Sequence, residues 1–147
     1  ISWYFTYPTR NQISLYTGYN ILQADINTVH FIDNINNGLK DYLVLTNQTV
    51  ALAALREFGF AKYLPTPAGE QYFYSIPTGG PLYQYFRKMV YEEPKRQWME
   101  QAMRFAGVKK AYFVHTNYWA PAADIRDKAK LEADRWWEIS NGRACIF

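Results

Sequence analysis

The stretch YLVLTNQTVALAALREFG, residues 42–59, decides the fold. It opens with Tyr42-Leu43-Val44-Leu45-Thr46, a short apolar run of the kind that is buried on both faces of a parallel sheet. Asn47 follows as a helix cap, and residues 48–58 are apolar nearly all round, which predicts a deeply covered helix. Gly59 ends that helix. A buried strand followed directly by a buried helix is the building unit of an α/β fold.

The same alternation of strand and helix continues on both sides of this unit. Before it, residues 3–7 predict a strand, and a helix capped by Asp25 ends at Asn36-Asn37-Gly38. After it, the sequence predicts a loop with Pro65 and Pro67 and then a strand at 71–76. Two helices follow, one that begins at Pro81 and one that begins after Pro94 and ends at Gly107. The sequence next predicts a strand at 111–114, a loop at 115–119, and a helix that begins at Pro121 and whose apolar stripe reaches Trp136 and Trp137. Residues 140–143 predict a hairpin turn that returns the chain as an edge strand through Phe147.

This order of elements predicts a single α/β domain over residues 1–147. The expected architecture is a three-layer sandwich, with a mostly parallel sheet, helices on both faces and a C-terminal hairpin edge strand. The chain has 147 residues, of which 49% are hydrophobic and 20% charged, so disorder and coiled coil are excluded. Aromatic residues reach 18%, an excess that suits surfaces with one apolar and one wet side.

Charge and cysteine content exclude further classes. The net charge of +3 is too small to predict nucleic-acid binding. Residues 1–73 carry four basic and five acidic side chains, and residues 74–147 carry twelve and eight, which fits either a solvated helix face or an anionic partner such as lipid phosphate. The only cysteine, Cys145, forms no internal disulfide and is expected to be a buried thiol. With two histidines besides, the chain offers no metal-ligand spacing, and no metal or cofactor is predicted.

Small polar residues follow three of the predicted strands. Because ligands bind outside the carboxyl ends of parallel strands, these loops are the candidate binding edge. The candidate ligand-binding residues are Asn47, Gln48, Thr78, Gly79, Gly80, His115, Asn117, Tyr118 and Trp119.

Each group of candidates has a structural alternative, and no catalytic residue is assigned. Residues 78–80 could present backbone N–H groups to an anion or form a plain turn into a helix. His115 could be a general base oriented by Asn117, or a loop histidine bonded to backbone. Tyr118 and Trp119 could stack on a sugar together with other aromatic residues, or all of these could be core. Those other residues are Tyr72, Tyr74, Tyr83 and Tyr85.

The first 50 residues resemble a known kind of domain. The motifs are Tyr7-Pro8-Thr9-Arg10, Ser14, Gly18-Tyr19 and Asp25-Ile26-Asn27-Thr28-Val29, which lead to Tyr42-Leu43-Val44-Leu45. They are similar to the opening of the soluble extracytoplasmic domain that follows the last spans of polytopic GT-C-type membrane glycosyltransferases. The resemblance implies that the catalytic acids and the lipid-phosphate site lie in the spanning part, so that this domain is non-catalytic and supports acceptor or sugar binding.

Two functions therefore stay open. The first is an extracytoplasmic domain at the cell membrane, with the membrane-spanning part of the same polypeptide as its partner and a sugar or lipid phosphate as its ligand. The chain opens at Ile1 without Met, so we expect it to be excised from a longer protein, and it has no run of the ~20 apolar residues that a span needs. The second is a stand-alone binding module for a small anionic or sugar ligand at the carboxyl edge.

Overall fold

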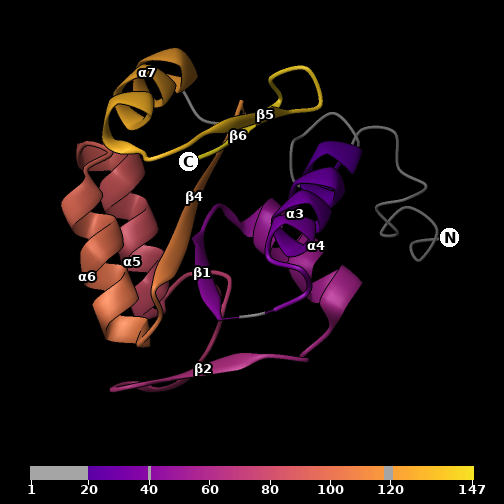
Figure 1. Cartoon of the computed structure of the whole chain (residues 1–147), viewed down its shortest axis with the longest axis vertical. Coiled ribbons are helices and arrows are strands. Elements are labelled where there is room, and N and C mark those ends of the chain that lie inside the picture. Colours follow the sequence, from indigo (N-terminus) through magenta and orange to yellow (C-terminus); the bar gives the residue numbers. More distant parts are fainter. Residues whose placement is uncertain (1–19, 40, 118–120) are drawn as a thin grey trace, which may run out of the picture.

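A mixed sheet flanked by helices organises the part of the chain that the structure describes. The computed structural model describes residues 20–39, 41–117 and 121–147. The elements are α3 (Gln23–Ile35), β1 (Tyr42–Leu45), α4 (Gln48–Phe58), β2 (Tyr63–Thr66), β3 (Gly69–Tyr72), α5 (Pro81–Arg87), the π-helical turn η2 (Lys88–Glu92), α6 (Arg96–Ala106), β4 (Lys110–Thr116), α7 (Ala122–Glu132), β5 (Trp137–Ile139) and β6 (Ala144–Ile146) (Figure 1). The predicted strand at residues 3–7 lies outside the described residues.

β1 lies at the centre of the packing. It pairs with β4 in parallel, from Tyr42 opposite Lys110 to Leu45 opposite Phe113. On its other side Val44 N–H donates to the Phe73 carbonyl at 2.9 Å, and Ser75 N–H donates to the Val44 carbonyl at 3.1 Å. All four residues of β1 are buried, as the apolar run predicts.

The sheet is mixed, so the α/β class is confirmed but the mostly parallel sheet is not. Its order is β1-β4-β6-β5, in which β1 and β4 are parallel while β6 is antiparallel to both of its neighbours. The predicted hairpin is present: Ser140, Asn141 and Gly142 all have positive φ, and they reverse the chain between β5 and β6. The edge strand, however, is β5 rather than the C-terminal strand. β6 lies inside the sheet, where its three apolar residues are fully buried.

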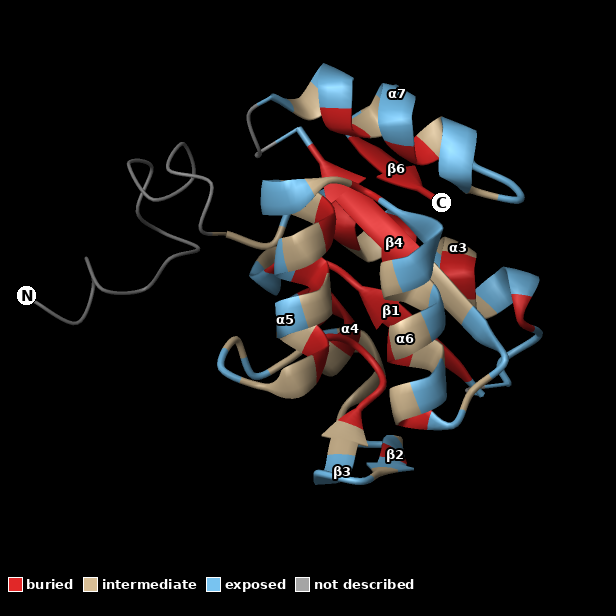
Figure 2. Ribbon diagram, turned by 90° about the vertical axis from the view of Figure 1, so that its left-hand side faces the viewer, coloured by how far each residue is buried: buried red, intermediate tan, exposed pale blue. Residues whose placement is uncertain are grey.

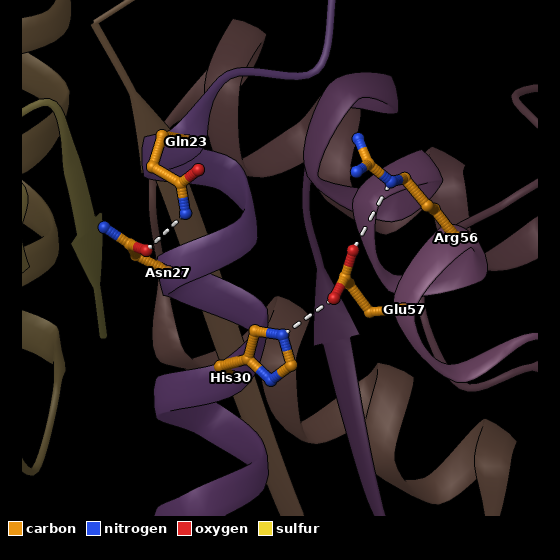
Figure 3. A network of polar contacts seen from close by, with 5 residues as sticks. All are labelled: Gln23, Asn27, His30, Arg56 and Glu57. Carbon is orange, nitrogen blue, oxygen red and sulfur yellow. Dashed lines mark hydrogen bonds and ion pairs between the residues drawn. The ribbon is translucent and has the colours of Figure 1, made fainter.

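Helices cover both sides of β1 and β4. α3 and α4 lie on one side, and α5, α6 and α7 lie on the other, with the strands forming the buried centre (Figures 1 and 2). α3 and α4 lie side by side. His30 Nε2 of α3 is 2.9 Å from Glu57 Oε2 of α4, and Arg56 also contacts Glu57 (Figure 3).

The helix ends follow local chemistry, with one correction. α4 has the predicted bounds: the Asn47 side chain accepts a hydrogen bond from Val50 N–H at its start, and Gly59 is its C-cap. The predicted cap of α3 was wrong by three residues. α3 begins at Gln23, and the Asp25 carboxylate, inside its first turn, accepts a hydrogen bond from Leu22 N–H at 2.8 Å.

Three further predictions are corrected. The predicted loop with Pro65 contains β2, which pairs with β3 in a two-stranded antiparallel sheet, because Pro65 lies at an exposed position where a missing N–H is tolerated. β4 continues to Thr116, so His115 lies in a strand and not in a loop. α7 ends at Glu132, so Trp136 and Trp137 do not extend its apolar stripe, and Trp137 begins β5.

Two adjacent glycines give a prediction about the turn before α5. Gly80 N–H donates to the Pro77 carbonyl at 2.8 Å, and a Cβ added at Gly80 would lie only 3.0 Å from that same oxygen. We therefore expect Gly80→Ala to lower the free energy of unfolding by about 1–2 kcal/mol.

The matched control is Gly79→Ala. No atom lies within 4 Å of a Cβ added there, and Gly79 is outside the left-handed region. This variant should be neutral or stabilised by roughly 0.4–1 kcal/mol, because alanine restricts the unfolded chain. Urea unfolding of both variants measures the difference, and equal losses at the two positions would contradict this account of the turn.

Candidate functional site

The carboxyl ends of three parallel segments meet at one edge of the sheet. β1 lies between residues 73–75 and β4, and hydrogen bonds join its end to both neighbours. The Ser75 hydroxyl accepts from Thr46 N–H at 2.9 Å and donates to the Thr46 carbonyl at 2.8 Å. The Asn47 amide donates to the Thr116 hydroxyl at 3.0 Å. The three loops that contain the predicted site residues therefore start from one polar cluster.

Asp25 joins this cluster from α3 and was not among the predicted site residues. Its side chain is almost fully buried. Burial raises the pKa of Asp25, while hydrogen bonds from Leu22 N–H and the Thr49 hydroxyl act in the opposite direction. Thr49 also lies 3.4 Å from the Asn47 side-chain oxygen. The polar contacts thus run from α3 through the start of α4 to the end of β4. The sequence feature that could have identified Asp25 is a carboxylate in the first turn of a helix that begins at this edge.

The predicted site residues divide into a buried base and an accessible rim. Asn47 and His115 are buried and cannot touch a large ligand in this conformation. Gln48, Gly79 and Asn117 are exposed, and Thr78 and Gly80 are half-buried. Tyr118 and Trp119 lie outside the described residues. The rim that a ligand can reach, within the part of the chain described, consists of Gln48, Thr78, Gly79 and Asn117.

His115 lies opposite Cys145 of β6, fully buried in the sheet. Neither of its ring nitrogens has a hydrogen-bond partner among the described residues, so Asn117 does not orient it. Burial, assisted by the nearby Arg126 guanidinium, lowers the pKa of His115 to about 4.

The thiol beside His115 is held in its neutral form as well. Burial raises the pKa of Cys145, although Arg126 opposes this shift. Because the lowered imidazole pKa and the raised thiol pKa both disfavour ions, the pair is a neutral imidazole next to a protonated thiol. A thiolate–imidazolium nucleophile needs the opposite shifts.

The aromatic residues considered for sugar stacking are largely core. Tyr72 and Tyr74 are buried, and each packs edge-on against Phe73 with ring centroids 4.9 Å apart. Tyr83 and Tyr85 are half-buried on α5, where Tyr83 packs against Phe86 and Tyr85 against Phe105 of α6. A sugar at this edge would therefore be held by the hydrogen-bonding rim rather than by these rings.

The shifted pKa of His115 predicts a pH-dependent stability. Its folded pKa of about 4 lies below the unfolded value of 6.5, so the unfolded chain takes up a proton first and acid favours unfolding. Between pH 7 and pH 5 the free energy of unfolding should fall by about 2 kcal/mol on account of this group. Urea unfolding as a function of pH measures the loss, and His115→Gln should remove it.

His30→Gln is the matched control because His30, the chain's other histidine, is exposed. This variant should keep the loss that His115 causes between pH 7 and pH 5. If His115→Gln and the wild-type protein lost stability equally over this range, the buried, neutral state of His115 would be refuted.

Comparison with known proteins adds no relative. No protein-family model, curated protein or solved structure matches this chain. Among residues 20–39, 41–117 and 121–147 no helix is long and apolar enough to cross a membrane. In the same residues, no group of three or more His, Cys, Asp or Glu side chains is placed to hold a metal ion. The function is therefore inferred from the carboxyl edge itself.

Proposed function

We propose that this domain binds a small polar ligand, an anion or a sugar, at the carboxyl edge of its sheet. The ligand would contact the rim formed by Gln48, Thr78, Gly79 and Asn117. The buried contacts of Thr46 with Ser75 and of Asn47 with Thr116 support the proposal, because they fix the loops that carry this rim. A site built on loops held by a rigid base loses little conformational entropy on binding.

Gly79 is the observation that carries the proposal. Gly80 is explained by the close Pro77 carbonyl, but Gly79 has open space around it and no left-handed backbone. Nothing within the described fold requires a glycine at position 79. A glycine beside open space, at the edge where ligands of α/β sheets bind, lets a ligand approach the backbone closely.

The chemistry of the rim favours a small polar ligand. Its side chains are amides and a hydroxyl, which donate and accept hydrogen bonds without carrying charge. Gln48 also lies in the first turn of α4, an 11-residue helix whose positive dipole end faces this edge. Neutral donors near a helix N-terminus suit a phosphate, a carboxylate or a sugar hydroxyl.

A ligand screen with graded Gly79 variants tests this proposal. Thermal-shift and calorimetric titrations with nucleotides and sugar phosphates should reveal a ligand that stabilises the wild-type protein. Gly79→Val should weaken its binding at least tenfold, because the branched side chain fills the approach to the backbone, while Gly79→Ala should weaken it less. Gln48→Ala and Asn117→Ala should each weaken it several-fold.

Unfolding curves separate binding from stability in these variants. Gly79→Val should unfold within about 1 kcal/mol of the wild-type protein, because a Cβ added there has no atom within 4 Å. The proposal is wrong if no compound in the screen binds. It is also wrong if Gly79→Val binds with undiminished affinity.

A second proposal concerns the setting of the domain. We propose that the chain is the non-catalytic, extracytoplasmic domain of a multi-span membrane glycosyltransferase, where the rim would support acceptor or sugar binding. The support is the resemblance of residues 1–50 to such domains. Sequencing the gene upstream of the Ile1 codon should find several apolar spans of about 20 residues each. A gene without such spans would refute this setting and leave the binding edge unaffected.

A further inference from the structure

A groove of about 750 Å³ lies far along β4 from the carboxyl edge. α6, the end of α7 and residues 109–113 line it, at the amino-terminal end of β4. α6 and α7 lie on the same side of the sheet (Figure 2). β6 pairs with Val114 to Thr116 of β4, and Phe147 N–H and carbonyl both pair with Phe113. The groove therefore lies beside the part of β4 that pairs with β1.

Apolar side chains of an adaptable kind line this groove. All three methionines of the chain lie there, Met89 from η2 and Met99 and Met103 from one face of α6. Methionine is flexible and polarisable, and such side chains adapt to ligands of different shape. Trp137 and Phe147 add aromatic surface. The volume falls in the range of pockets that hold small molecules, roughly 300–1,000 Å³.

Some of the charged side chains that line the groove form ion pairs, and others do not. Arg96 contacts two of the acids: its backbone N–H donates to the Glu132 carboxylate at 2.8 Å, and its guanidinium lies 2.5 Å from the Asp134 carboxylate. Glu100, the third acid, also acts electrostatically on Arg96. By contrast, Lys109 and Arg135 make no ion pair with a described residue. Arg135 does act electrostatically on Asp134, but the lining holds four basic and three acidic side chains, so a net positive charge lies beside the apolar floor.

We propose that this groove binds a small amphipathic anion as a free molecule. Its apolar body would pack on the three methionines and the aromatic rings, and its carboxylate, sulfate or phosphate head would lie at Lys109 and Arg135. This site is independent of the carboxyl edge, because it shares none of that rim's residues. An apolar floor with cations at its border selects such a ligand over a neutral or cationic one of the same tail.

Three probes with one tail and different heads test the proposal. Octyl sulfate, octyl glucoside and octyltrimethylammonium, each below its micellar concentration, are titrated into protein labelled with methyl-13C methionine. Because every methionine lines the groove, octyl sulfate should shift all three methyl resonances with one saturation curve. Its affinity should exceed that of octyl glucoside about tenfold, and octyltrimethylammonium should bind most weakly.

Two variants locate the head and the tail. The double change Lys109→Glu and Arg135→Glu should weaken octyl sulfate about tenfold and leave octyl glucoside within about twofold. Met103→Gln, which keeps the length of the side chain, should weaken both probes alike. The matched control is the double change Arg56→Glu and Arg87→Glu, two exposed cations on α4 and α5 outside the groove, which should change neither affinity.

Several outcomes would overturn the proposal. Methionine resonances that no probe shifts would show that the groove takes no such ligand. Equal affinity for the three heads would remove the anionic character of the site. Shifts that depend on protein concentration without a probe would assign the groove to a second copy of the chain. A response to anionic phospholipid vesicles but not to octyl sulfate would assign it to a membrane surface.

Discussion

The burial of β1 on every side is the constraint on which the rest of the structure depends. Its main chain bonds to β4 on one edge and to residues 73–75 on the other, and helices cover both of its faces. The end of the strand is buried, so its main-chain polar groups need partners within the protein. The Ser75 hydroxyl satisfies both main-chain groups of Thr46, and the Asn47 side chain serves the start of α4 and the Thr116 hydroxyl. The same contacts that stabilise the fold therefore tie three loops to one edge.

This constraint explains why the binding edge has a buried base and an accessible rim. The side chains nearest the strand ends bond to other parts of the fold, which leaves ligand contact to residues one to four positions further along each loop. His115 illustrates the division. It is inside β4, where burial favours the neutral ring, so its chemistry is that of a core residue although it lies close to the edge. A binding role for the edge is consistent with this geometry, whereas acid–base chemistry by His115 would require its surroundings to open.

The sequence predicts the local units well and the sheet order poorly, for a physical reason. α4 and β1 follow from residues 42–59 alone, because a cap, an apolar run and a terminal glycine act over a few residues. The convergence of Asn47 with Thr116 also follows, once parallel pairing is assumed. The sequence does not predict that β6 lies between β4 and β5, because this depends on which strand of the hairpin pairs with β4. β2 was not predicted because a proline inside a strand is locally typical of a loop. Asp25 was not predicted as part of the candidate site because its burial depends on α4.

The two ends of β4 show how one strand can support two kinds of surface. At its carboxyl end β4 pairs with β6, and the Asn47 amide donates to the Thr116 hydroxyl, which ties the end of the strand to the start of α4. At its amino-terminal end β4 pairs with β1, from Lys110 to Phe113, and side chains of α6 and α7 line the groove beside that part of the strand. Side chains adapt their shape where paired backbone cannot. The apolar, methionine-lined groove therefore lies beside the part of β4 that pairs with β1, and the hydrogen-bonding rim lies beyond the part that pairs with β6. β4 has seven residues, of which four pair with β1 and three with β6, so its two ends carry different surfaces.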